Sequence, residues 1–258
     1  MNSHNHKTKP AVLAGLCAAG LLAATAPAAA DDTLRIGTEG AYPPFNYIDP
    51  DGELRGFDID IAEALCDEMG RNCEFVTQDW DGIIPGLLAE RYDVIIASMS
   101  ITEERQESVD FTERYYTNRL QFIGPEDMEV EISEEGLDGM TVGVQRATIS
   151  GQWLEDNMEG VVDINRYDTQ ENAYLDLETG RVDLVLADNL VSHEWLESDQ
   201  GEGFAYKGDP VYEGDEIAIA LRPGSDELRE ELNEAIRAIR EDGTYAEINA
   251  EYFPFDIY

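Results

Sequence analysis

Hydroxyl, acidic and basic side chains gather at the ends of apolar segments in this chain, beginning with residues 97–105 (ASMSITEER). Ser98 and Ser100 follow an apolar strand, and Arg105 lies about one turn into the helix that comes next. Ligands bind at strand ends in α/β sheets, and helix N-terminal amides together with a guanidinium fork suit a carboxylate. The segment therefore predicts a site for a free carboxylate. The structural alternative is that Ser100 and Glu103 form a capping box and Arg105 pairs with neighbouring acids.

Two further strand ends supply groups that would complete such a site. A tight turn at residues 145–149 (QRATI) follows the strand that ends at Val144, and the first amides of the next helix could meet the same anion. The apolar strand 184–187 ends at Asp188, which is placed to accept hydrogen bonds from an ammonium group. A ligand with a carboxylate beside an ammonium is an α-amino acid. Alternatively, Asp188 is only the N-cap of the helix that begins at Asn189.

A side-chain pocket is predicted near the first strand. Glu39 and Tyr42 lie at the end of that strand, and Trp80 adds a second aromatic ring between two acids. A cationic side chain gains about 0.5 to 2 kcal/mol over an aromatic face, and Glu39 could neutralise its tip. The alternative interpretation places Tyr42 and Phe45 in the core and Trp80 at a partly buried surface position.

Motifs of common enzymes are absent from the sequence. It contains no Walker glycine loop, no H-E-x-x-H zinc motif and no G-x-S-x-G nucleophile elbow. His193 is the one histidine beyond the first thirty residues, and its helical surroundings indicate a surface or packing role. One histidine makes a poor metal site, so we expect no metal ion. Because the enzyme motifs are missing, we also expect no cofactor and no catalytic residue.

Strands and helices alternate along the chain, which predicts an α/β fold with a largely parallel sheet. The alternation restarts after an irregular stretch, so two α/β lobes are expected. The expected strands are residues 34–38, 73–76, 94–97, 141–144, 161–164, 184–187 and 216–221, with a hairpin at 47–54. The expected helices are residues 58–70, 83–89, 150–157, 171–177 and 226–240 and a last one that ends at Tyr252, with Asp58 as the N-cap of the first.

The first thirty residues are typical of a secretory signal peptide. Two lysines precede an apolar run at residues 11–24, which leads to three consecutive alanines. The run is shorter than a membrane span of about 20 residues. We therefore predict cleavage before Asp31 and a periplasmic location. Lipidation of Cys17 is not expected, because Leu16 before it is bulkier than the small residue found before the cysteine in lipoproteins.

Removal of the leader leaves two cysteines, Cys66 and Cys73. An oxidising compartment lets them pair, so we expect a disulfide. Closing a loop this short is worth about 2 to 3 kcal/mol in the chain-entropy model. The spacing differs from the C-x-x-C of oxidoreductases, which indicates a structural bond.

The chain has 56 acidic and 17 basic residues, and without the two leader lysines its net charge is −41. Such a charge repels a duplex and excludes non-specific nucleic-acid binding. Lys207 is the only lysine of the mature chain. A large acidic excess with arginine in place of lysine predicts a surface that stays hydrated in concentrated salt, and hence a halophilic source. The alternative is an ordinary acidic secreted protein, because self-repulsion is tolerable at moderate salt.

Several stretches, in order, resemble solute-binding protein family 3, the extracytoplasmic amino-acid-binding proteins of ABC importers, and in particular its lysine/arginine/ornithine and histidine binders. The likeness covers essentially all of residues 33–258. It rests on residues 35–39 (RIGTE), 56–60 (GFDID), 98–105 (SMSITEER), 110–112 (DFT) and 242–245 (DGTY). The resemblance implies a type II periplasmic-binding-protein fold, in which two crossover strands join two lobes that close over the ligand. The first lobe would comprise residues 31–118 and 215–258, and the second lobe residues 119–214.

The resemblance also implies roles for single residues. Ser100 and Arg105 would hold the α-carboxylate together with amides near Ile149, Asp188 would hold the α-ammonium, and the residues near the first strand would line the side-chain pocket. The full set of expected ligand-binding residues is Glu39, Tyr42, Trp80, Ser98, Ser100, Arg105, Gln145, Thr148, Ile149 and Asp188. The disulfide of similar family members falls on Cys66 and Cys73. The sequence departs from the family pattern at Ala97, Ala147 and Ile149, where serine, glycine and threonine are common.

The ligand class implied is that of basic amino acids, namely arginine, lysine, ornithine and histidine. Neutral polar amino acids and opines are the alternatives, because Gln145 lies where variation tracks ligand choice. The implied partners are the free amino acid and a membrane permease with a cytoplasmic ATPase, and we expect a monomer. The second hypothesis is an enzyme on this scaffold, such as an arogenate or prephenate dehydratase. It would need a general acid in the cleft, for which Glu39 is the candidate.

Overall fold

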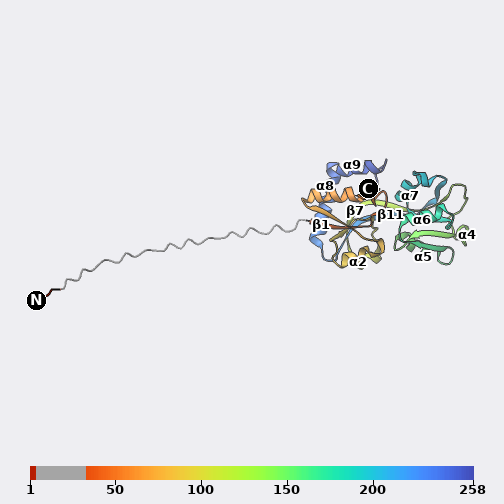
Figure 1. Ribbon diagram of the computed structural model, residues 1–258. Coiled ribbons are helices and arrows are strands. Elements are labelled where there is room, and N and C mark those ends of the chain that lie inside the picture. Colours follow the sequence, from red (N-terminus) through yellow and green to blue (C-terminus); the bar gives the residue numbers. More distant parts are fainter. Residues whose placement is uncertain (4–32) are drawn as a thin grey trace. The chain divides into compact units, whose positions relative to one another are not determined.

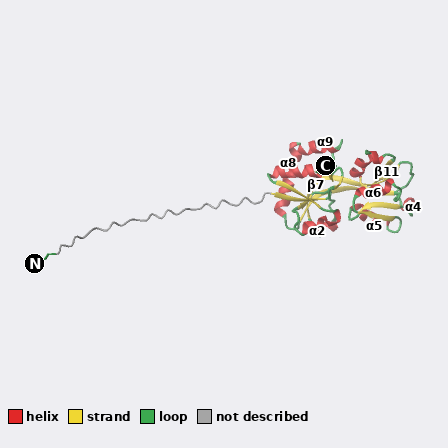
Figure 2. Ribbon diagram, in the orientation of Figure 1, coloured by secondary structure: helices red, strands yellow, loops and turns green. Residues whose placement is uncertain are grey.

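The computed structural model describes residues 1–3 and 33–258. Most of the predicted leader, including Cys17, and the predicted cleavage site before Asp31 lie outside these residues. From residue 33 onward, helices pack on both faces of a mixed sheet, as the ribbons of Figures 1 and 2 show. The predicted α/β class is therefore confirmed.

An eight-stranded sheet runs through this part of the chain in the order β5-β1-β6-β11-β7-β10-β8-β9. Its strands are β1 (Thr33–Thr38), β5 (Asn72–Thr77), β6 (Val94–Ile95), β7 (Asp110–Pro125), β8 (Thr141–Gln145), β9 (Asp163–Tyr167), β10 (Leu184–Asp188) and β11 (Phe204–Leu221). The two long strands β7 and β11 pair antiparallel at the centre. The lobe boundaries predicted after residues 118 and 214 fall inside these two strands.

We call the half of the fold built on β5, β1 and β6 the first lobe. These strands are parallel, and β11 adds an antiparallel neighbour to β6. Its helices are α1 (Phe57–Met69), α2 (Ile83–Leu88), α3 (Glu103–Gln106), α8 (Asp226–Asp242) and α9 (Thr244–Tyr252), and a 3-10 turn lies at Trp80–Gly82. In Figure 1, α8 and α9 lie on one side of this half and α2 on the other. Apolar residues recur on one face of α8, where Leu232, Ile236 and Ile239 are buried against α1.

The second lobe is the half built on β10, β8 and β9, which are also parallel. Its helices are α4 (Glu134–Leu137), α5 (Ile149–Met158), α6 (Gln170–Glu178) and α7 (Asn189–Leu196), with a 3-10 turn at Asp199–Gly201. Leu154 of α5 packs with Val142 and Leu186 in an apolar cluster. On α6 and α7, Tyr174 and Trp195 stack with ring centroids 4.6 Å apart. Each lobe thus has a core that fixes the ends of its strands.

A small three-stranded sheet accompanies the first lobe. It consists of β2 (Ala41–Tyr42), β3 (Asn46–Ile48) and β4 (Leu54–Arg55) in antiparallel order. The predicted hairpin at residues 47–54 is its β3–β4 pair. β2 places Tyr42 next to the end of β1, where the cleft described below begins.

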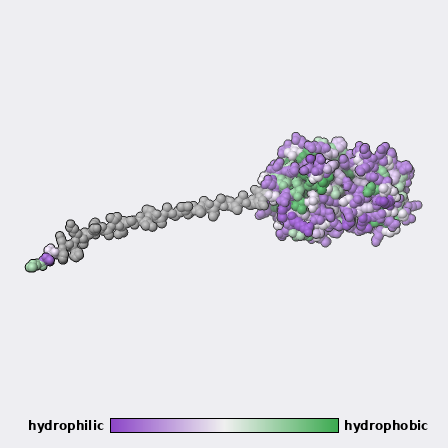
Figure 3. All heavy atoms as spheres, in the orientation of Figure 1, coloured by the Kyte–Doolittle hydropathy of each residue, from purple (hydrophilic) through white to green (hydrophobic). Residues whose placement is uncertain are grey.

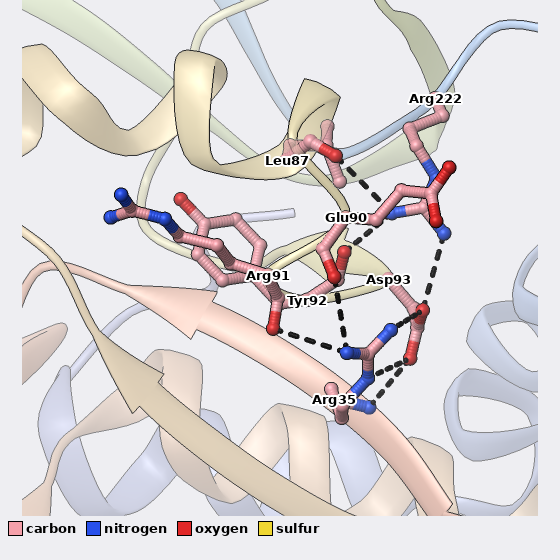
Figure 4. A network of polar contacts seen from close by, with 7 residues as sticks. All are labelled: Arg35, Leu87, Glu90, Arg91, Tyr92, Asp93 and Arg222. Atoms are coloured by element: carbon pink, nitrogen blue, oxygen red, sulfur yellow. Dashed lines mark hydrogen bonds and ion pairs between the residues drawn. The ribbon is translucent and has the colours of Figure 1, made fainter.

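The disulfide predicted between Cys66 and Cys73 is present and joins α1 to β5. A polar network also holds the first lobe together (Figure 4). Asp93, just before β6, accepts hydrogen bonds from Arg35 of β1 at 2.7 Å and from Arg222, just after β11, at 3.2 Å. The network fastens three chain segments near the start of β1, at the opposite end of the strand from the cleft.

The visible face of the folded part is mainly hydrophilic (Figure 3), which agrees with the acidic composition. Lys207, the single lysine of the predicted mature chain, is not part of that surface, because it is only 8% exposed. Its Nζ donates to the carbonyl oxygens of Glu126 at 3.2 Å and Met128 at 2.9 Å. The cations on the surface of residues 33–258 are therefore nearly all guanidinium groups.

Three local predictions are wrong. Asp58 is not the N-cap of α1, which begins at Phe57 after Gly56. A Cβ at residue 56 would lie 2.2 Å from the carbonyl oxygen of Phe45, so only glycine fits there, and Asp58 turns into the interior. Strand β9 begins at Asp163 and not at 161, and β11 extends far beyond the predicted 216–221. The irregular stretch noted before residue 141 contains the long strand β7, whose ladder with β11 is interrupted by bulges.

Candidate ligand-binding cleft

All ten ligand-binding residues predicted from the sequence line one small chamber between the lobes, together with Ala97. The first lobe supplies the ends of β1 and β6, the Trp80 turn and the start of α3. The second lobe supplies the β8–α5 turn and the end of β10. Parallel strands bring their carboxyl ends to the same edge of a sheet, which is why these distant segments meet. Their convergence is a feature of the structure, while their role in binding stays a prediction.

Arg105 lies where the two lobes meet. Its Nη1 donates to the carbonyl oxygen of Ser100 at 2.8 Å, and its Nη2 donates to that of Ala147, in the other lobe, at 3.2 Å. The alternative interpretation, a capping box of Ser100 and Glu103, is wrong, because Thr102 caps α3 by accepting from the amide of Arg105 at 3.1 Å. Burial lowers the pKa of Arg105, against the opposing charges of Asp215 and Asp188. Within the described part of the chain, Arg105 donates to carbonyl oxygens and forms no ion pair with a carboxylate, which suits its guanidinium to bind one.

The turn from β8 into α5 faces Arg105. Thr148 is the N-cap of α5, and its Oγ1 lies 2.8 Å from the carbonyl oxygen of Gln145 and accepts from the amide of Gly151. Ala147 has a φ of 55°, in the left-handed region that glycine adopts without strain. Its carbonyl oxygen accepts from Trp80 Nε1 at 3.0 Å as well as from Arg105. The first amides of α5 therefore lie beside the guanidinium, as an anion site requires.

Asp188 ends β10 and is 7% exposed. Asp188 occupies the N-cap position of α7, as the alternative interpretation had it, but its carboxylate makes no capping hydrogen bond to the helix. Instead, Oδ2 accepts a hydrogen bond of 2.7 Å from the hydroxyl of Tyr42 in the first lobe. Burial, reinforced by the nearby Asp215 carboxylate, raises the pKa of Asp188 to about 7. A cation placed here would remove that penalty.

Glu39 also lines the chamber and lies directly after the end of β1. Its Oε1 accepts a hydrogen bond of 2.6 Å from Nε2 of Gln145, which also donates to the carbonyl oxygen of Asp168 at 3.4 Å. Burial raises the pKa of Glu39 to about 7, and the hydrogen bond from Gln145 only partly offsets the effect. Trp80 is 8% exposed, and the guanidinium carbon of Arg105 lies 5.4 Å from its ring centroid. The predicted cation pocket thus has both a carboxylate and aromatic walls.

Five residues behind the chamber were not predicted as part of the site, namely Asn46, Asp58, Tyr115, Asn118 and Asp215. Asp58 accepts from Asn46, Ser98 and Tyr115, and Asp215 accepts from Ser100 and Asn118. Both acids are at most 2% exposed. Asp215 could have been noticed, because it is a charged residue in the apolar alternation of residues 215–221, whereas Tyr115 and Asn118 give no local signal.

The chamber measures about 20 Å³, close to the space of one water molecule. An amino acid can therefore enter only when the lobes separate. Outside it, a groove of about 810 Å³ shares Arg105, Gln145, Thr148 and Ile149 as a wall. At the rim, Arg146 of the second lobe pairs with Asp81 of the first at 3.1 Å. This conformation is closed, and side chains of the two lobes satisfy one another's polar groups.

The cleft offers binding groups for a zwitterion. Within the described residues, no cluster of three histidine, cysteine or acidic side chains is arranged to hold a metal ion. His193 lies outside the cleft, with its ring 6.0 Å from that of Phe255. None of the helices between residues 33 and 258 has the length and apolar content to cross a membrane.

Comparison with known proteins gives consistent results. The sequence profile of the bacterial extracellular solute-binding proteins, family 3, matches residues 34–255. An L-arginine-binding protein of Pseudomonas aeruginosa is 41% identical over 89% of this chain and 91% of its own length. The lysine/arginine/ornithine-binding periplasmic protein of Escherichia coli is 34% identical over 97% and 99%.

Solved structures agree with the fold as well. An ancestral arginine-binding protein bound to arginine superposes with a TM-score of 0.81 and 37% identity, over 86% of this chain and 98% of that one. An ancestral amino acid-binding protein described as a precursor of cyclohexadienyl dehydratase gives 0.79 and 30%, over 86% and 96%. The type II two-lobed fold expected from the sequence is confirmed by these neighbours. With a family profile spanning nearly the whole folded part and relatives well above 30% identity, the chain belongs to the bacterial extracellular solute-binding proteins, family 3.

Proposed function

We propose that this protein binds a free basic amino acid, with arginine preferred, and delivers it to the permease of an ABC importer. The observation that carries the proposal is the charge of the chamber. Four acids lie in it or directly behind it, namely Glu39, Asp188, Asp58 and Asp215, and within residues 33–258 Arg105 is the cation that lines the same chamber. The named relatives that bind arginine or lysine support the same ligand class.

The geometry supports a role for each end of the ligand. Arg105 and the first amides of α5 would hold the α-carboxylate, and Asp188 would hold the α-ammonium. Glu39, Tyr42 and Trp80 would surround the side chain, with Gln145 beside its tip. Buried charges without partners are unfavourable, and an arginine ligand supplies two cationic groups and one anionic group to a chamber in which the acids outnumber the single cation, Arg105.

Neutral ligands fit the same chamber less well. Glutamine or citrulline offers Glu39 a neutral donor in place of a cation, so part of the cost of burying this carboxylate is not recovered. An opine carries a further carboxylate on its α-nitrogen, which would have to extend towards the neighbouring groove of about 810 Å³. Both classes belong in the ligand screen as competitors of arginine.

A thermal-shift screen tests the proposal directly. It contains the twenty amino acids, ornithine, citrulline and octopine, at both low and molar KCl. A ligand that binds only the folded state raises the unfolding midpoint, by about 2.7 kcal/mol of stability at one hundred times Kd. We expect the largest shifts with arginine, then lysine and ornithine. A larger shift with glutamine or octopine than with arginine would contradict the ligand class.

One observation favours a second candidate, a dehydratase. The pKa of Glu39 is raised to about 7, which is the range that a general acid requires. The binding function explains the same pKa through burial of a carboxylate that awaits a cation. Prolonged incubation with prephenate and arogenate, followed by product analysis, separates the two functions. Recovery of both compounds unchanged supports binding, whereas formation of an aromatic product would support the enzyme.

The cellular setting of this proposal is the periplasm, with export by the N-terminal leader and action as a monomer. The disulfide between Cys66 and Cys73 supports an oxidising compartment. We further propose a halophilic source. A net charge of −41 for the exported chain and a single lysine that is itself buried support a surface adapted to concentrated salt, against the alternative of an ordinary acidic secreted protein.

A further inference from the structure

Two buried acids behind the chamber each bind the hydroxyl group of a chamber serine. Ser98 Oγ donates to Asp58 Oδ2 at 3.0 Å, and Ser100 Oγ donates to Asp215 Oδ2 at 3.1 Å. The acids belong to different elements, Asp58 to α1 and Asp215 to the long strand β11, and neither lines the chamber. The same arrangement therefore occurs twice around one small space.

The direction of these two hydrogen bonds is fixed by chemistry. Burial raises the pKa of both carboxyl groups, but the oxygen that faces each serine also accepts from a side-chain amide nitrogen, Asn46 Nδ2 on Asp58 Oδ2 and Asn118 Nδ2 on Asp215 Oδ2. An amide nitrogen can only donate, so these carboxylate oxygens act as acceptors. A serine hydroxyl has a single proton to donate. Each serine thus directs its proton away from the chamber and has only oxygen lone pairs left for a ligand.

Further donors hold the two acids in place. Asp58 also accepts from Asn46 Nδ2 at 2.8 Å and from the Tyr115 hydroxyl at 2.7 Å, and it is fully buried. Asp215 also accepts from Asn118 Nδ2 at 3.4 Å. Because these carboxylates are anchored on the side away from the cleft, they can keep the serine hydroxyls in one orientation while a ligand enters and leaves.

We propose that Asp58 and Asp215 are positioning residues that hold Ser98 and Ser100 as hydrogen-bond acceptors and thereby select ligands with a primary ammonium group. The inference rests on the proposed function. A primary ammonium has three N–H donors, and Asp188 lies in the same chamber to accept one of them. The two serine oxygens accept the others, and they disfavour a carboxylate in the same place. The α-carboxylate is then held by Arg105 and backbone amides and not by the Ser100 hydroxyl, which revises the role expected from the sequence.

The test compares arginine with 5-guanidinovaleric acid, which is arginine without its α-amino group, by calorimetry at pH 7.5. The wild-type protein is expected to prefer arginine strongly. Asp215→Ala leaves the Ser100 hydroxyl free to rotate and is expected to reduce this preference about ten-fold, the value of one hydrogen bond to a charged group. Asp215→Asn is the matched control, because its amide oxygen can still accept from Ser100, so the preference should change less than about three-fold.

A double-mutant cycle with Ser100→Ala shows whether Asp215 acts through the hydroxyl. The Asp215→Ala change should have little further effect on the preference in the Ser100→Ala background. Equal losses for both ligands, or additive effects of the two changes, would assign Asp215 a general structural role and overturn the inference. The Ser98→Ala and Tyr115→Phe changes test the second pair, Ser98 with Asp58, without removing the fully buried Asp58.

Failure of the proposed function gives a different result. If the wild-type protein binds 5-guanidinovaleric acid as tightly as arginine, the inference is overturned while a basic side-chain pocket stands. If it binds neither compound, the proposed function falls and the inference falls with it. Circular dichroism and thermal melts of every variant verify that a lost preference is measured on folded protein.

Discussion

Replacement of Glu39 by glutamine is the sharpest test of how the cleft recognises its ligand. The change removes a negative charge from the chamber and keeps the shape of the side chain. In the structure, Glu39 accepts a 2.6 Å hydrogen bond from Gln145, and it forms no ion pair within residues 33–258. An arginine guanidinium would supply that cation, whereas the urea group of citrulline has nearly the same shape and no charge.

The expected loss follows from this charge. Truncating one partner of a buried charge pair costs about 2 kcal/mol or more, so Glu39→Gln should weaken arginine binding by about 30-fold or more. Citrulline should lose less than about five-fold, because an amide can still bond to its urea group. Calorimetry measures the affinities of arginine and citrulline for the wild-type protein and for the Glu39→Gln variant. The four values form a cycle in which one change removes the charge of residue 39 and the other removes the charge of the ligand side chain.

The pH dependence gives an independent measurement of the same group. Glu39 has its pKa raised to about 7 by burial, and a bound guanidinium would lower that pKa again. Arginine binding therefore releases a proton, and its affinity should fall as the pH drops below 7, by at most about ten-fold per pH unit for one proton. Citrulline keeps only the dependence that comes from Asp188, whose pKa is also raised to about 7.

In the Glu39→Gln variant, the arginine and citrulline profiles should become parallel. Equal losses of the two ligands at constant pH, or profiles that are parallel already in the wild type, would show that Glu39 does not face the ligand side chain. The assignment of the pocket would then be wrong. Loss of citrulline alone would indicate that the pocket is built for neutral ligands.

Three other predictions follow from the structure. Arg105→Ala should weaken arginine and citrulline alike by about 100-fold or more, because both share the α-carboxylate; a folded variant that binds within ten-fold of wild type would remove Arg105 from the site. Cys66→Ser with Cys73→Ser should lower the free energy of unfolding in urea by about 2 to 3 kcal/mol and leave arginine affinity unchanged; a changed affinity would mean that the disulfide reaches the cleft. Raising KCl from about 0.1 M to about 2 M should raise the unfolding midpoint, since screening relieves repulsion within a strongly acidic chain; an unchanged midpoint would contradict the halophilic proposal.

Much of the cleft could be predicted from the sequence because its residues stand at strand ends. Ser98 and Asp188 each end or follow a short apolar run, Arg105 lies in the helix that comes after the first run, and the carboxyl ends of parallel strands must meet. The periodic pattern therefore predicted both the strand and the position of the functional side chain at its end. The same reasoning placed Thr148 at a helix start, where it is the N-cap of α5.

Residues whose role depends on distant partners could not be predicted in this way. Asp58 has the local appearance of a helix cap, and its interior position is decided by Asn46, Ser98 and Tyr115, which are up to 57 residues away. Asp215 meets Ser100 across 115 residues. The long strand β7 lacked a clear alternation, because it passes from one lobe to the other and buries different faces along its length.

Under the proposed function, the polar atoms that join the lobes in this conformation are the ones that a ligand would bind. In the closed conformation, Asp188 accepts from Tyr42, Glu39 accepts from Gln145, and Arg105 donates to Ala147 across the cleft. A ligand that enters must replace what it displaces, because a buried polar group left without a partner costs about 1 to 3 kcal/mol and more if it is charged. A zwitterion with a cationic tip provides donors for both acids and an acceptor for the guanidinium. Neutral ligands would then be selected against because they leave the Glu39 carboxylate without a counter-charge, and not because of a steric clash. This selection should therefore weaken at low pH, where Glu39 is protonated.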